Sequence, residues 1–193
     1  MPYYNAKFAA AIALLLTILI PVYWLSQFGV FFEKLLWPST ENAFYWRHIF
    51  TVFMHVLVIV TLLNVRASLA HTEATLLKRI IVGFALIIAV FSVIWVLFGR
   101  VEASGPDSSL VVLGSVLLIL LLSGLVTFCA AIQFHQPKLP ASLRMASLFI
   151  ALSILLPAIT LAILLPVTPI MLTIGCGLIA VYFYKPTQPV DVV

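Results

Sequence analysis

Charged residues are scarce in this 193-residue sequence. Only 8% of the residues are Asp, Glu, Lys or Arg, against roughly 25% in soluble domains, and 64% are apolar. This balance excludes a water-soluble globular fold, because too few polar side chains are available to cover its surface. The ten Lys and Arg and the six Asp and Glu fall between long apolar runs or at their edges, so none lies deep within a run.

Catalytic signatures are missing as well. The two cysteines, Cys129 and Cys176, lie inside apolar runs and are interpreted as small apolar side chains rather than disulfide or redox partners. No GxSxG, HExxH, Walker, GxGxxG or CxxC pattern occurs. No pair of carboxylates lies within a run to relay protons or hydrolyse a bond. We therefore expect no enzymatic activity, no metal centre and no bound cofactor.

The chain has instead a succession of six apolar runs. They cover residues 8–28, 46–65, 80–99, 110–133, 146–166 and 167–184. Most are near the length of about 20 residues that an α-helix needs to cross ~30 Å of hydrocarbon. Backbone groups in lipid must be hydrogen-bonded within their own segment. The sequence therefore predicts an all-α, polytopic membrane bundle of six helices, with residues 1–193 in one membrane domain and the first run retained.

The distribution of cations predicts the orientation of that bundle. If all six runs span, seven of the ten Lys and Arg share one side with both termini, and three share the other side with four of the six acids. Cytoplasmic loops carry an excess of Lys and Arg, so we expect an N-in, C-in protein of a cell membrane. The short loops favour a bacterial inner membrane. The basic balance reflects topology, and no nucleic-acid partner is expected.

The first outer connection, residues 29–45, is rich in aromatic side chains, among them Phe31, Phe32 and Trp37. Residues 30–37 are predicted to form a short helix that lies in the membrane interface and is ended by Pro38. Such a helix can be a surface anchor, a lid over an outward cavity, or a docking surface for a partner. The anchor is the plainest interpretation, because aromatic residues are common at membrane interfaces.

One histidine, His55, lies near the middle of an apolar run, and His48 precedes it on about the same helical face. Two histidines on one helical face suggest haem, but their depths differ by about 10 Å at 1.5 Å per residue. Haem ligation by His55 would then need a second copy of the chain across a two-fold axis. The alternative is a neutral His55 that is hydrogen-bonded to Ser, Thr or a backbone carbonyl of a neighbouring helix.

Proline interrupts the last third of the chain. Pro157, inside the fifth run, frees the carbonyl of Ser153 four residues earlier and is expected to kink the helix. With His55 and Thr160, these residues form a candidate pocket wall for a small apolar ligand. The structural alternative is a kink whose freed groups are satisfied by Ser or Thr side chains. The run after Pro169 is short, which leaves a re-entrant hairpin as an alternative to a full span.

Small residues recur every four positions in two runs, and such ridges let helix backbones approach closely. They are Ala9, Ala13 and Thr17 in the first run and Ser123, Thr127 and Ala131 in the fourth. Packing within one chain is the simpler interpretation, and a subunit interface is the other.

Two main functional hypotheses follow from this pattern. The first is a non-enzymatic integral membrane subunit or accessory protein, which binds other membrane proteins through apolar helix faces and the aromatic outer loop. The second is a small transporter or solute-binding component for an uncharged or apolar molecule. A homodimeric haem-binding membrane protein that uses His55 and His48 is a minor third hypothesis.

Overall fold

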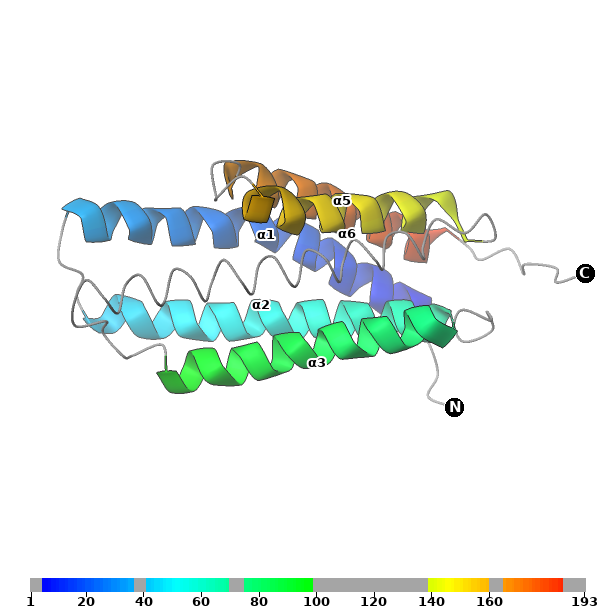
Figure 1. The fold of residues 1–193 in the computed structure, drawn as a ribbon, viewed down its shortest axis with the longest axis horizontal. Helices are drawn as coiled ribbons and strands as arrows, with labels where there is room; N and C mark the ends of the chain where they lie inside the picture. Colours follow the sequence, from blue (N-terminus) through cyan, green and yellow to red (C-terminus); the bar gives the residue numbers. More distant parts are fainter. Residues whose placement is uncertain (1–4, 37–40, 70–74, 99–138, 160–164, 186–193) are drawn as a thin grey trace, which may run out of the picture.

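The computed structural model describes residues 5–36, 41–69, 75–98, 139–159 and 165–185, and these residues are almost entirely helical (Figure 1). The described elements are α1 (Ala6–Leu36), α2 (Glu41–Ser68), α3 (Thr75–Phe98), α5 (Ala141–Ile159), the 3₁₀ turn η1 (Leu165–Val167) and α6 (Thr168–Tyr184). The prediction of an all-α chain is confirmed for this part of the protein. The predicted run 110–133 lies outside the described residues.

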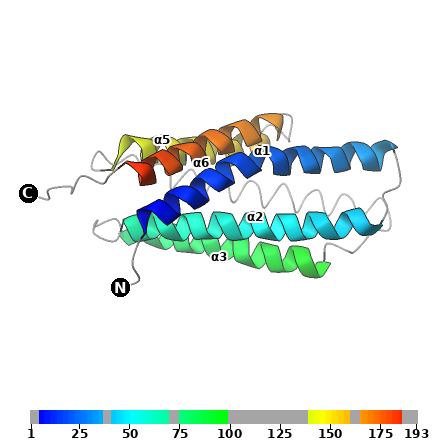
Figure 2. The same cartoon turned by 180° about the vertical axis from the view of Figure 1, so that it is seen from behind.

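The described helices pack in the order α3, α2, α1, α6, α5, and each contacts the next. Consecutive helices in this series run in opposite directions along the long axis, as Figures 1 and 2 show from the two sides. The start of α1 and the end of α6 lie at the same end of the bundle, which we call the terminal end. Helices α3 and α5 also both begin at the terminal end, so α3 finishes at the end opposite to the start of α5.

Local chemistry explains where α1 begins. The side-chain oxygen of Asn5 accepts hydrogen bonds from the backbone N–H groups of Lys7 and Phe8, at 3.1 and 3.2 Å. These bonds satisfy amide groups that have no partner inside the helix, which is the usual role of an N-capping asparagine. The helix continues through Pro21, and the hydroxyl of Thr17 donates to the carbonyl of Ala13 at 2.8 Å.

The far end of α1 corrects one expectation. Residues 30–36 are helical as predicted, but they continue α1 instead of forming a separate interfacial helix after residue 28. A glycine such as Gly29 weakens a helix by only about 1 kcal/mol, and the first strong breaker that follows is Pro38. Phe31 and Phe32 therefore belong to the last turns of α1, whereas Trp37 lies outside the described residues. At 1.5 Å per residue, α1 is about 45 Å long.

Two of the described helices are long and apolar enough to cross a membrane, by length and composition. The qualifying segments are Ala6–Ser26 of α1 and Ile49–Ser68 of α2. Two shorter apolar segments, Ala141–Leu156 of α5 and Thr168–Tyr184 of α6, fall below that length. Helix α3 coincides with the third predicted run and begins five residues earlier, at Thr75.

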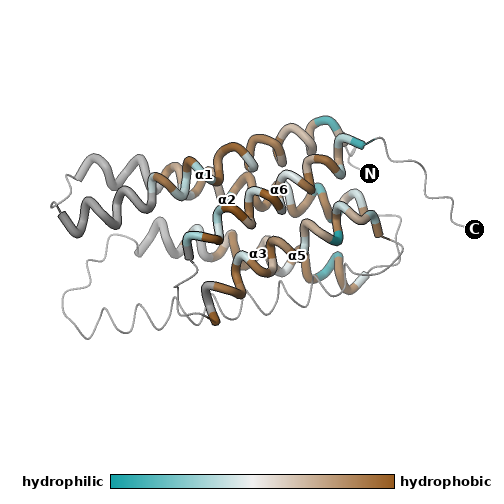
Figure 3. The backbone as a smooth tube through the Cα atoms, turned by 90° about the horizontal axis from the view of Figure 1, so that it is seen from above, coloured by the Kyte–Doolittle hydropathy of each residue, from teal (hydrophilic) through white to brown (hydrophobic). Residues whose placement is uncertain are grey.

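Buried side chains form two clusters. The larger cluster lies toward the terminal end and joins all five helices, with Ala9 and Ala13 of α1 packed among residues that include Val65, Leu77 and Phe183. The smaller cluster lies farther along the bundle, where Leu16 and Ile20 of α1 meet Met54 and Leu57 of α2 and Cys176 of α6. Figure 3 shows hydrophilic residues gathered at the terminal end, with apolar residues along the coloured helices.

Candidate functional site

The most polar contact inside the described bundle joins α2 to α3. Nδ1 of His55 lies 2.7 Å from Oγ of Ser92, and the same hydroxyl donates to the carbonyl of Ile88 at 2.8 Å. A serine hydroxyl has a single proton. The hydroxyl therefore either donates to Ile88 and accepts from a protonated Nδ1, or donates to an unprotonated Nδ1, depending on the tautomer of His55. In both cases His55 is hydrogen-bonded to a serine of a neighbouring helix, which is the type of contact that the packing interpretation proposes.

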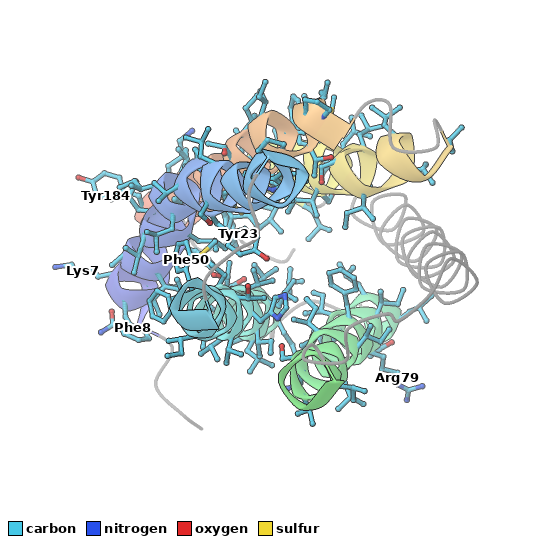
Figure 4. All side chains as sticks on the ribbon, turned by 90° about the vertical axis from the view of Figure 1, so that its left-hand side faces the viewer. Lys7, Phe8, Tyr23, Phe50, Arg79 and Tyr184 are labelled. Atoms are coloured by element: carbon cyan, nitrogen blue, oxygen red, sulfur yellow. The ribbon has the colours of Figure 1, made fainter. Side chains whose placement is uncertain are left out.

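A second polar contact joins α2 to α1, one helical turn away from His55. The hydroxyl of Thr51 contacts the phenol oxygen of Tyr23 at 3.4 Å, which is long for a hydrogen bond between hydroxyls. The Tyr23 ring meets Phe50 edge to face, with ring centroids 5.6 Å apart, and both side chains are labelled in Figure 4. Since Thr51 precedes His55 by four residues, the two lie on neighbouring positions of the α2 surface.

These contacts place neutral polar side chains of three helices within about one turn of α2. The group, which we call the three-helix polar cluster, consists of Tyr23 on α1, Thr51 and His55 on α2, and Ser92 on α3. The sequence analysis identified only His55. Two sequence signals point to the others: Ser92 is the single polar residue between Gly83 and Trp95, and Thr51 stands four positions before His55.

Near Pro157, the carbonyl of Ser153 has a hydrogen-bond donor from the next helix. The hydroxyl of Thr168, the first residue of α6, donates to the carbonyl of Ser153 at 3.0 Å, which is the carbonyl that Pro157 deprives of its helical partner. The Ser153 hydroxyl donates to the carbonyl of Ile150 at 2.6 Å. Ser153 is 1% exposed and Thr168 is 7% exposed. The hydroxyl and the carbonyl of Ser153 therefore both have hydrogen-bond partners inside the protein.

The structure does not bring the predicted pocket residues together. His55 is on α2 and Ser153 is on α5, and these two helices do not pack directly against each other, because α6 and α1 come between them in the series of contacts. Pro157 is in the last turn of α5, and Thr160 lies outside the described residues. The three-helix polar cluster and the region of Pro157 are thus two separate features.

In the part of the chain that the structure describes, no group of three or more His, Cys, Asp or Glu side chains is arranged to hold a metal ion. His48 is on α2 with a side chain outside the described set, and Cys129 also lies outside it. Cys176 is buried and free among the residues that the structure describes, within the small cluster between α1, α2 and α6.

The ridge of small residues on α1 packs against α6 of the same chain. Ala9 and Ala13 are 0% exposed and belong to the cluster that contains Ala180 and Phe183. A Cβ atom added at Gly177 would lie 3.7 Å from the Thr17 methyl group, which marks a close approach of the two backbones. This first ridge therefore serves packing within the chain. The second ridge, Ser123, Thr127 and Ala131, lies outside the described residues.

Comparison of the chain with protein-family models, with curated proteins and with solved structures found no match.

Proposed function

We propose that this protein is a multi-pass integral membrane protein with six spans and both termini in the cytoplasm, and that it acts as a non-enzymatic subunit or accessory protein for other membrane proteins. The proposed location is a cell membrane, specifically a bacterial inner membrane. The observation that carries this proposal is the outward display of large apolar side chains along the described helices.

These outward side chains recur along the helices at helical spacing. On α1 they include Leu14, Ile18, Val22 and Leu25, on α2 Ile49, Phe53 and Val56, on α3 Leu86, Ile87, Val90 and Val93, and on α6 Ile170, Ile174 and Val181. Leu25 is 73% exposed and Leu86 is 64% exposed. Soluble monomers rarely expose apolar patches larger than a few hundred Å². Lipid or apolar faces of membrane partners are the environments that suit such a surface.

The directions of the helices support the proposed number of spans. Helix α3 ends opposite to the terminal end, and α5 begins at the terminal end. The chain between them contains the apolar run 110–133, whose length suits one further crossing. With α6 returning to the terminal end, six crossings put both chain termini on one side.

The polar chemistry of the described helices supports a non-enzymatic role. Away from the helix ends, the polar side chains with hydrogen bonds described for them are mainly hydroxyls, the Asn64 amide and the His55 imidazole, and these hydrogen bonds stay within the protein. Thr61 and Asn64 of α2 bond back to the carbonyls of Leu57 and Val60. Such bonds satisfy polar groups in an apolar environment and do not assemble an acid and base pair.

A second candidate function rests on the three-helix polar cluster. Its hydroxyl, phenol and imidazole groups come from three adjacent helices and are uncharged in either neutral tautomer of His55. Neutral donors and acceptors within an apolar bundle suit an uncharged or apolar solute. This observation favours a solute-binding or transport component as the alternative.

Affinity purification from native membranes in a mild detergent separates the two functions. The subunit proposal predicts that the protein migrates in a larger complex on a native gel and that mass spectrometry finds the same membrane protein with it in stoichiometric amount. A stable monomer that carries a small molecule, and that loses the molecule on His55→Ala while keeping its fold, would favour the solute-binding alternative. An absorption band typical of haem would contradict both.

A further inference from the structure

Cations form a rim around the terminal end of the bundle. The described members of this basic rim are Lys7 at the start of α1, Arg66 at the end of α2, Lys78 and Arg79 at the start of α3, Arg144 at the start of α5, and Lys185 directly after α6. The described part of the terminal end thus carries six cations.

The rim points outward around the bundle and not into one cleft. Lys7, Arg66, Arg79 and Lys185 are exposed. In the view along the bundle axis, the Lys7 and Arg79 side chains lie on opposite sides and extend away from the helices (Figure 4). A compact anion cannot touch both side chains at once. A charged surface that surrounds the whole protein can.

Arg144 gives the rim an unsatisfied donor. Among the residues that the structure describes, its buried Nε atom has no hydrogen-bond partner, although buried polar groups are almost always paired. Arg144 lies in the first turn of α5, where no acidic residue balances its charge and where the helix dipole already favours an anion over a cation. The side chain is partly exposed, so a phosphate group beside it would compensate the charge without reaching the buried Nε.

The outward apolar faces limit what the rim can meet. Next to the rim cations and farther along the helices, α1 exposes Phe8 and Leu14, and α3 exposes Val82 and Leu86. A ligand must therefore present phosphate groups at the level of the cations and hydrocarbon beside the helices. Phospholipids with anionic headgroups have this combination, and basic residues next to a membrane-spanning helix attract them.

We propose that the basic rim binds anionic phospholipids of the leaflet that faces the terminal end, and that Arg144, whose charge no neighbouring acid balances, contributes more to this binding than the other single cations of the rim. This inference rests on the membrane insertion in the proposed function. The rim fixes the depth of the bundle in the bilayer, because the cations are drawn to the phosphate layer while the apolar faces remain in hydrocarbon.

The test is lipid retention measured by native mass spectrometry. The purified protein is incubated with equal amounts of phosphatidylglycerol and phosphatidylcholine that have the same acyl chains, and the bound lipids are counted. The wild type should retain phosphatidylglycerol in preference. The triple variant Lys7→Gln/Arg66→Gln/Arg79→Gln, which changes exposed side chains only, should lose that preference by about fivefold or more. The control Lys34→Gln/Arg47→Gln, at the opposite ends of α1 and α2, should keep it.

Single substitutions separate the contribution of Arg144 from the general charge of the rim. Arg144→Gln should reduce retention of phosphatidylglycerol more than Arg79→Gln does, although each removes one cation. Equal losses would contradict the special contribution of Arg144. The single variants also provide the test if the triple variant fails to fold, as judged by circular dichroism.

Other outcomes would overturn the proposal as a whole. Equal retention of the two lipids by the wild type, or an unchanged preference in the triple variant, would reject lipid binding by the rim and leave the proposed function intact. Displacement of the lipid by excess inorganic phosphate would show that the rim recognises a free anion instead. Release of the wild-type protein from vesicles by alkaline carbonate would reject membrane insertion and the rim proposal together.

Discussion

The hydroxyl of Thr168 donates a hydrogen bond of 3.0 Å to the backbone carbonyl of Ser153, across the junction between α6 and α5. Pro157 cannot supply the amide proton that this carbonyl would otherwise accept. The first residue of one helix therefore repairs the hydrogen bond that a proline removes from its neighbour. The bond is buried on both sides, so its loss cannot be compensated by water.

The variant Thr168→Val tests this bond, because valine keeps the shape of threonine and removes the donor. An unpaired buried carbonyl costs about 1–3 kcal/mol, and the thermal midpoint in detergent should fall accordingly. Thr173→Val is the matched control, since the Thr173 hydroxyl bonds only to Pro169 of its own helix, and it should change the midpoint much less. In a Pro157→Ala background, residue 157 regains its amide proton, and Thr168→Val should then have a smaller effect. Equal effects in both backgrounds would contradict the repair.

The contact between His55 and Ser92 is predicted to couple α2 to α3. Buried hydrogen bonds between membrane helices are worth about 0.6 kcal/mol on average and up to about 1.7 kcal/mol. We expect His55→Ala and Ser92→Ala each to destabilise the protein, and the double variant to cost less than the sum of the two. Thermal unfolding of the four proteins in one detergent measures this coupling. Strictly additive losses would show that the two side chains do not interact.

Glycine positions give a test of helix packing with an internal control. A Cβ atom at Gly175 would lie 2.8 Å from Cγ1 of Ile150 and 3.3 Å from the carbonyl oxygen of Ala146. Gly175→Ala should therefore push α6 away from α5 and destabilise the protein by about 1–3 kcal/mol, the usual cost of overpacking. A Cβ atom at Gly83 on α3 would meet nothing within 4 Å.

Gly83→Ala should accordingly leave the thermal midpoint unchanged or raise it. The higher helix propensity of alanine would stabilise the protein by up to about 1 kcal/mol. The two substitutions make the same chemical change on two helices of one protein. A lower midpoint for Gly83→Ala than for Gly175→Ala would mean that the packing of α5 against α6 is described wrongly.

The sequence predicts the helices better than their ends. Hydropathy locates the apolar part of α1, but α1 extends to Leu36 because no strong breaker precedes Pro38. Helix α2 likewise extends beyond its apolar run: it begins at Glu41, whereas the run starts at residue 46. A hydropathy boundary reports where apolar residues stop, whereas a helix ends where its backbone loses hydrogen-bond partners.

Prediction of the candidate sites depended on whether the partners are close in sequence. The effect of Pro157 on the Ser153 carbonyl follows from a fixed spacing of four residues, and it was predictable. The donor that satisfies this carbonyl, the Thr168 hydroxyl, comes from the next helix, and the sequence does not predict it. His55 stands out as a histidine inside an apolar run, but its partner Ser92 is 37 positions away. Spacing within one helix is set by local geometry, and contacts between helices are set by packing.

In the proposed topology, the bundle crosses the membrane with both of its termini on the cytoplasmic side. Single cysteines at Arg79, Lys185 and Glu41, in a background without Cys129 and Cys176, test it with a membrane-impermeant thiol reagent. In intact cells we predict labelling at position 41 only, and labelling at positions 79 and 185 after the membrane is permeabilised. Labelling of positions 79 and 185 from opposite sides, or of positions 41 and 79 from the same side, would contradict the account.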